Sequence, residues 1–102
     1  MKETNQKELE KIISNSSKLL VVEFFATWCR YCKILNSELE KITEFENFEI
    51  LKVDVDKEPL LALYYQVEVY PTVVFIKEGK IVNKIFGALE KKEVLEEINK
   101  YL

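Results

Sequence analysis

Residues 22–33 read VEFFATWCRYCK and connect a run of apolar side chains to two cysteines. The apolar run extends from Leu19 to Phe25 without alternation, which predicts a strand buried on both faces of a sheet. Cys29 and Cys32 follow it, and the next apolar residues recur at the spacing of one helix face: Leu35, Leu39 and Ile42. They predict an amphipathic helix that continues to about Glu44. The cysteine pair is therefore expected where a central strand passes into a helix.

The remainder of the chain adds three helices and three strands. Helices are expected over residues 5–13, 59–65 and 94–102, and strands over residues 50–56, 72–76 and 80–86. Asn5 and Glu8 have the spacing of a capping box, and residues 77–79 predict a β-hairpin between the last two strands. This order predicts a single α/β domain over residues 1–102, with a mixed four-stranded sheet and helices on both faces.

Composition narrows the range of functions. The 15 Lys and Arg against 18 Asp and Glu give a net charge of −3, which argues against binding to nucleic acid. The absence of histidine excludes the usual general base and every Ser/His or Cys/His pair. The longest apolar run is far shorter than the roughly 20 residues that span a bilayer, and the polar start is unlike a signal peptide. A cytoplasmic protein without membrane contact is expected, and the lack of an exposed apolar stripe predicts a monomer.

The spacing of the cysteines favours redox chemistry. At a helix N-terminus, free backbone N–H groups and the helix dipole stabilise a thiolate, and Arg30 adds a positive charge beside Cys29. Cys29 is then the nucleophile, and Cys32 is placed to attack a mixed disulfide formed at Cys29. Two other interpretations stay open at this point. The pair is half of a metal site completed by a second chain, or it is two small buried apolar side chains.

Residues 22–33 resemble the active-site segment of the thioredoxin family, with Trp28 before the first cysteine and Lys33 after the second. The resemblance continues in order through residues 52–56, 70–72, 77–79 and 87–89. It implies a thioredoxin fold in which the family's additional N-terminal strand is absent or vestigial, because residues 1–4 leave little room for it. It also implies that Cys29 attacks the substrate disulfide, that Cys32 resolves the mixed disulfide, and that the peptide bond before Pro71 is cis. The redox-active group is then the Cys29–Cys32 disulfide, and no metal or other cofactor is expected.

Glu23 is a lone carboxylate in an otherwise apolar strand, and burial there raises the pKa of a carboxyl group toward the range useful for proton transfer. By resemblance it occupies the position of the family's buried aspartate, which assists the second cysteine, and Lys52 matches the lysine beside that acid. The side chain here is one methylene longer. The alternative interpretation is a structural ion pair between Glu23 and Lys52 across adjacent strands.

Several residues are expected to contact substrate. Trp28 and Tyr70 flank the cysteines and present an apolar surface, and by resemblance Pro71 and Gly87 border the same groove. Between the cysteines stand Arg30 and Tyr31, where thioredoxins usually have Gly-Pro. Because this pair favours the reduced thiolate form, we expect a couple more oxidising than thioredoxin.

The sequence therefore predicts a thiol-disulfide oxidoreductase that reduces disulfide-containing proteins. Either a thioredoxin reductase or glutathione is expected to supply the electrons. Val69 adds a side chain, where a glycine is common, on the surface that would meet such a reductase. The alternatives are a more oxidising disulfide oxidase or isomerase, a glutaredoxin-like enzyme, and a non-catalytic binding module.

Overall fold

The computed structural model describes residues 1–102 and alternates strands and helices along the chain. The elements in order are β1 (Lys2–Glu3), α1 (Gln6–Asn15), β2 (Leu19–Phe25), α2 (Arg30–Glu40), β3 (Phe48–Asp54), α3 (Pro59–Tyr64), β4 (Thr72–Lys77), β5 (Lys80–Phe86) and α4 (Lys91–Lys100). β2 and β5 have the bounds expected from the sequence. None of the helices has the length and apolar character needed to span a bilayer.

The helix boundaries follow local hydrogen bonding. The capping box expected at Asn5 and Glu8 is confirmed, with each side chain accepting from the backbone N–H of the other residue. α2 ends at Glu40 rather than near Glu44, because the N–H groups of Lys41 and Ile42 bond three residues back and tighten the last turn. Ile42 nevertheless reaches the core, so it has the apolar periodicity of the helix without belonging to it.

The sheet has five strands in the order β1-β3-β2-β4-β5, rather than the four predicted. The additional strand is the vestigial one: Lys2 and Glu3 pair in parallel with Leu51 and Lys52 of β3. The four-strand prediction was wrong on this count, because two residues are enough for a parallel pairing at the sheet edge. The other pairings agree with the mixed sheet, since β2 is parallel to β3 and antiparallel to β4.

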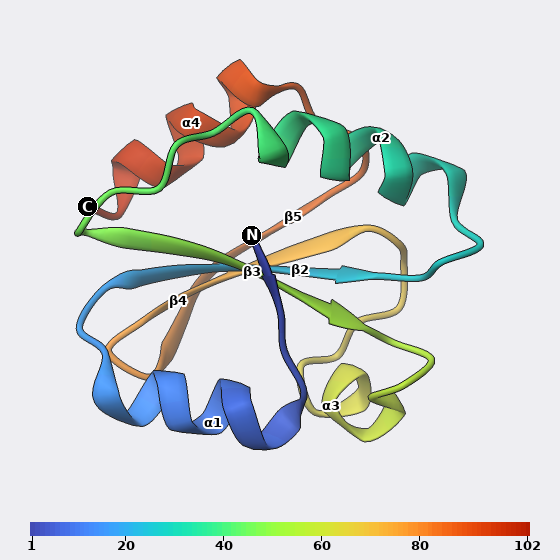
Figure 1. The fold of residues 1–102 in the computed structure, drawn as a ribbon, viewed down its shortest axis with the longest axis horizontal. Coiled ribbons are helices and arrows are strands. Elements are labelled where there is room, and N and C mark those ends of the chain that lie inside the picture. The colour runs from blue at the N-terminus through green and yellow to red at the C-terminus, as the bar shows by residue number, and fades with distance from the viewer.

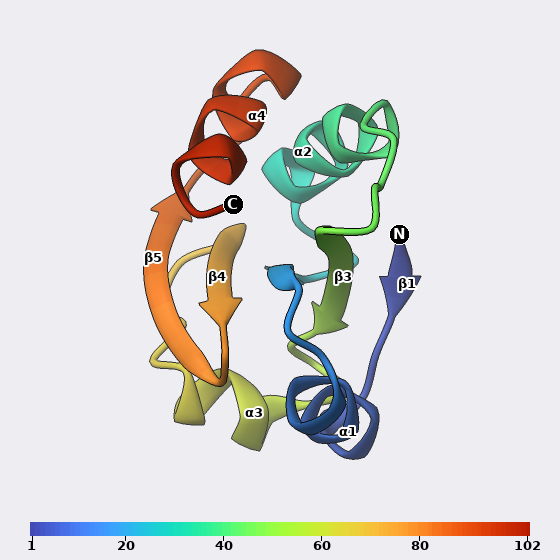
Figure 2. The same ribbon diagram turned by 90° about the vertical axis from the view of Figure 1, so that its left-hand side faces the viewer.

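Helices cover both faces of the sheet. α1 and α3 lie on one face and α2 and α4 on the other, with the sheet between them (Figures 1 and 2). A cluster of 17 buried residues forms the core on the α1 and α3 side, and a cluster of 11 forms the core under α2 and α4. β2 is the central strand, and all seven of its residues are buried. The loop after β2 leads directly to the N-terminus of α2, where the cysteines lie.

Candidate active site

Cys29 is the N-cap residue of α2, and its backbone is extended, with φ −87° and ψ 116°. Its Sγ accepts a hydrogen bond from the backbone N–H of Cys32 at 3.2 Å, so the sulfur takes the place of the capping oxygen usual at this position. The helix dipole therefore points its positive end at this sulfur. The local structure matches the environment that the sequence predicted for a nucleophilic thiolate.

The two thiols differ in exposure. Both are free in this structure, but Cys29 is 7% exposed whereas Cys32 is 1% exposed. Burial, followed by the hydrogen bond with Cys29, raises the pKa of Cys32 to about 12. Cys29 is therefore the more accessible of the two residues, and the Cys32 thiol is the harder one to deprotonate.

Glu23 lies on β2 and is fully buried. Burial raises the pKa of its carboxyl group from 4.5 to about 8, although the charge of Lys52 and a hydrogen bond from Asn36 both act in the opposite direction. The negative charge of Glu23 also raises the pKa of the Cys32 thiol, so ionisation of the carboxyl group and of the thiol are linked. The carboxyl group is thus poised to exchange a proton near neutral pH, as the sequence predicted.

Lys52 is beside Glu23 in the register of β2 and β3. The two side chains nevertheless form no ion pair within 4.0 Å, so the alternative of a structural ion pair was wrong. The Lys52 ammonium group instead lies over the Phe25 ring, 5.3 Å from its centre. Lys52 therefore acts on Glu23 through its charge and not through a direct contact.

Asn36 is a site residue that the sequence analysis missed. Its Nδ2 donates to Glu23 Oε2 at 3.0 Å and to the carbonyl oxygen of Cys32 at 2.8 Å. The available signal was its position, one helical turn after Cys32 and next to the buried Leu35. Asn36 is half-buried at this position, and its amide reaches the carboxyl group on the sheet.

The expected substrate-contacting residues come together from three separate segments. Tyr70 stacks edge-on against Trp28, with ring centres 5.9 Å apart, and its carbonyl oxygen lies 3.8 Å from Cys29 Sγ. The peptide bond between Tyr70 and Pro71 is cis, as the resemblance implied. Gly87 donates its N–H to the Pro71 carbonyl at 3.1 Å, and a φ of +90° suits glycine there.

The rim of the site is open to solvent. Trp28 is 66% exposed and Tyr31 is 62% exposed, and Arg30 is exposed between the cysteines. The Trp28 ring is fixed by a bond that the sequence analysis also missed, from its Nε1 to Asp56 Oδ2 at 2.9 Å. An aromatic side chain that is both exposed and held in place can contact a partner without first becoming ordered.

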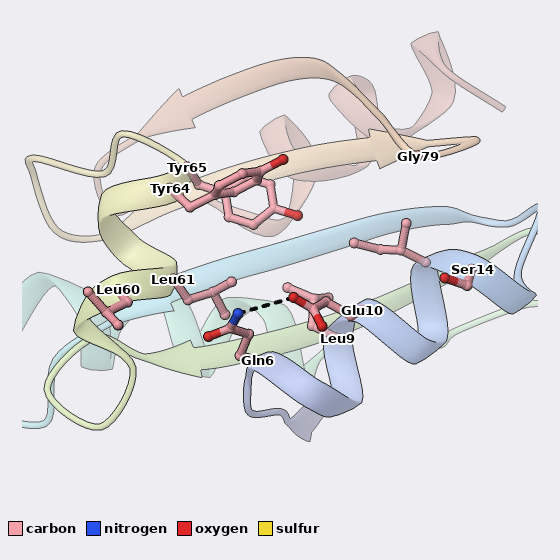
Figure 3. Close-up of a pocket in the computed structure, with 10 residues that line it drawn as sticks. Gln6, Leu9, Glu10, Ser14, Leu60, Leu61, Tyr64, Tyr65 and Gly79 are labelled. Carbon is pink, nitrogen blue, oxygen red and sulfur yellow. Dashed lines mark hydrogen bonds between the residues drawn. The ribbon is translucent and has the colours of Figure 1, made fainter.

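Of two cavities in the structure, one adjoins the site and the other lies apart from it. One of about 390 Å³ is lined by Cys32, Asn36 and Lys52. Another of about 590 Å³ lies between α1 and α3 and is lined by apolar side chains such as Leu9, Leu61 and Tyr64 (Figure 3). None of the predicted site residues lines this second cavity. No group of three or more His, Cys, Asp or Glu side chains is arranged to hold a metal ion.

Comparisons with known proteins agree with this geometry. The family model of thioredoxin matches residues 1–100. A thioredoxin of Mycoplasmoides gallisepticum is 36% identical over 94 residues, which cover 91% of this chain and 93% of that protein. A thioredoxin of Chlamydia trachomatis is 38% identical over 89 residues, covering 86% and 87% of the two chains. The crystal structure of Fasciola hepatica thioredoxin aligns over 100% of both chains, with a TM-score of 0.89 and 37% identity. This chain therefore belongs to the thioredoxin family and is a thiol-disulfide oxidoreductase.

Proposed function

We propose that the chain reduces disulfides in other proteins, with Cys29 as the attacking thiol and Cys32 as the resolving thiol. The Cys29 thiolate attacks one sulfur of the substrate disulfide, and the other substrate sulfur leaves as a thiolate. Cys32 then attacks Cys29 in the mixed disulfide, which closes the Cys29–Cys32 disulfide and releases the second substrate thiol. Two electrons pass to the substrate. The observation that carries this assignment is the unequal burial of the two cysteine residues at the start of α2.

Glu23 serves the second step as the proton acceptor for Cys32. Its support is a fully buried carboxyl group with a pKa raised to about 8, close to a thiol whose pKa is raised to about 12. A base whose pKa lies near the working pH is the most effective kind. The cavity lined by Cys32, Asn36 and Lys52 gives the proton a route to solvent.

The substrate lies against the surface formed by Trp28, Tyr70, Pro71 and Gly87, with Arg30 and Tyr31 beside it. An extended backbone fits here because an added Cβ on Gly87 would meet nothing within 4 Å, so the space above it is open. The exposed aromatic rings supply apolar contact without a demand for a particular sequence. Reduction of insulin by dithiothreitol tests the activity. The wild-type chain is expected to accelerate it, and Cys29→Ser is expected to remove the acceleration.

The family implies a reductase as the electron source, and we propose one of the thioredoxin reductase type. Val69, which is half exposed beside Tyr70, lies on the surface that would meet it. Consumption of NADPH in the presence of insulin, with thioredoxin reductase in one reaction and with glutathione and its reductase in another, separates the two donors. Faster turnover with glutathione would instead favour a glutaredoxin-like enzyme. A cytoplasmic location stays a prediction, which imaging of the tagged full-length protein can test.

A further inference from the structure

Asn36 connects the Glu23 carboxyl group to the residue that bears the second thiol. Both hydrogens of its side-chain amide are used, one on the Glu23 carboxyl group and one on the backbone of Cys32. Glu23 belongs to the sheet and Cys32 to α2, and no hydrogen bond joins their side chains directly. The amide is therefore the only direct link from the carboxyl group to the residue that bears the resolving thiol.

Two oxygen atoms beside this link have no partner. Glu23 Oε1 and Asn36 Oδ1 are both buried and accept no hydrogen bond. A buried acceptor without a donor destabilises the folded state, so such an arrangement persists only where other contacts hold it. Protonation of Glu23 changes one carboxyl oxygen from an acceptor into a donor. The amide thus lies beside a group whose hydrogen-bonding role changes with its charge.

We propose that Asn36 is a positioning residue that holds the Glu23 carboxyl group next to Cys32 and stabilises its ionised form. This inference rests on the proposed role of Glu23 in proton transfer. A glutamate has one more rotatable bond than an aspartate, so its carboxyl group needs an additional contact to be fixed in one place. The amide supplies that contact from α2, where its own position is fixed by the bond to Cys32.

The hydrogen bond from Asn36 to Glu23 can be removed without changing the charges around the carboxyl group. Lys52 on β3 and Cys32 on α2 are the titratable neighbours that interact with it, and the paired residue on β4 is the apolar Val73. Lys52 acts by charge alone, as shown by the absence of an ion pair. Removal of Asn36 therefore takes away the one hydrogen bond made to the carboxylate and leaves the charges in place.

The test is the ionisation of Glu23 in the reduced protein, followed by the carbon-13 NMR shift of its carboxyl group as the pH is raised. Asn36→Leu keeps the branched shape and excludes water but removes both donors. Its titration midpoint is expected to rise by about one pH unit, which is a tenfold fall in the ionised fraction at neutral pH. Asn36→Ala is expected to shift in the same direction by less, because water can fill the space. Ser37→Ala, at the next position of α2 and exposed, is expected to match the wild type.

A midpoint in Asn36→Leu at or below that of the wild type would overturn the proposal. Loss of folding does not obscure the result, because alanine favours a helix more than asparagine does and Asn36→Ala gives a second measurement. A kinetic experiment separates this inference from the role of Glu23. If Asn36 acts through Glu23, Asn36→Leu slows the resolving step of the wild-type chain. Added to Glu23→Gln, the same substitution causes no further slowing. If Glu23→Gln alone leaves that step unchanged, the proton-transfer role fails, while the NMR midpoint still decides the positioning role.

Discussion

The rim and the floor of the site are only a few residues apart in sequence and have opposite environments. Trp28, Arg30 and Tyr31 are exposed to solvent, whereas Cys32 and Glu23 are enclosed. Cys29 stands between them, as the residue at which strand geometry gives way to the helix. The rim is suited to contact with other proteins and the floor to the movement of a proton. Changes at the rim should therefore alter partners and redox balance, and changes on the floor should alter rates and pH dependence.

The largest expected effect separates the two cysteines. In a reaction with the chromogenic disulfide dithiobis(nitrobenzoate), Cys29→Ser is expected to release almost no thionitrobenzoate, because Cys32 is buried and its pKa is raised to about 12. Cys32→Ser is expected to release one equivalent and to stay as a mixed disulfide, since attack by Cys29 does not need the second thiol. Absorbance and intact mass give both results. Rapid reaction of Cys29→Ser would contradict the assigned order of attack.

The pH dependence of stability should report the buried carboxyl group. The folded chain keeps a proton on Glu23 up to about pH 8, whereas the unfolded chain releases it near pH 4.5. The stability that the protonated Glu23 carboxyl group contributes is thus fully present below about pH 4.5 and is lost as the pH rises to about 8. Relative to Glu23→Gln, the free energy of unfolding is expected to fall by up to about 5 kcal/mol across this window. Urea unfolding of the reduced protein measures it.

An exposed carboxylate provides the control for that comparison. Glu46→Gln, in the exposed loop before β3, is expected to follow the wild-type stability curve at every pH. If Glu23→Gln also follows the wild-type curve, the Glu23 carboxyl group ionises at the same pH in the folded and unfolded chains. The buried floor of the site would then have no effect on the pKa of this carboxyl group.

The rate of the resolving step is expected to depend on the same group. Glu23→Gln keeps the shape of the side chain but cannot accept a proton, so the second release of thionitrobenzoate should slow by about 100-fold near neutral pH. The first release, which belongs to Cys29, should be unchanged. Stopped-flow absorbance over a range of pH distinguishes the two phases. In the wild type the second phase should become faster as the pH rises to about 8 and then level off, whereas in the variant it should stay slower and rise only with the thiolate fraction of Cys32.

The smallest expected effect lies at the rim. The positive charge of Arg30 and the backbone N–H of Tyr31 both favour the reduced form, so the double change Arg30→Gly and Tyr31→Pro should lower the reduction potential by about 30 mV. The wild type should correspondingly lie above the value near −270 mV that is typical of thioredoxin. Equilibration in glutathione buffers with thiol trapping measures both. A wild-type value at or below that of thioredoxin would contradict the assignment of this role to the dipeptide.

Much of the floor and the rim could be predicted from the sequence because local pattern determines them. The apolar run located β2 to the residue, and Glu23 within it stood out as a lone charge. The cysteine spacing located the start of α2. The cis bond before Pro71 was available only through family resemblance, since an X-Pro bond is usually trans.

The residues that were missed depend on how elements pack together. Asn36 became part of the site because the register of α2 over the sheet brings its amide to Glu23, which no local pattern encodes. Asp56 became the partner of Trp28 because the loop after β3 brings its carboxylate to the indole Nε1 just before α2. The pairing of β1 depends on a strand far along the chain, because Lys2 and Glu3 pair with Leu51 and Lys52 of β3.

The difference in exposure between the two sulfurs has a practical consequence for handling the protein. A limiting amount of an alkylating reagent should mark Cys29 and leave Cys32 as a free thiol, because Cys29 is the less buried residue and the raised pKa of Cys32 keeps that thiol protonated. The unmodified sequence therefore offers a single attachment point for a dye, a spin label or a solid support. A column prepared in this way would carry every molecule in the same orientation, with the rim against the matrix and the opposite end of the sheet facing the solution.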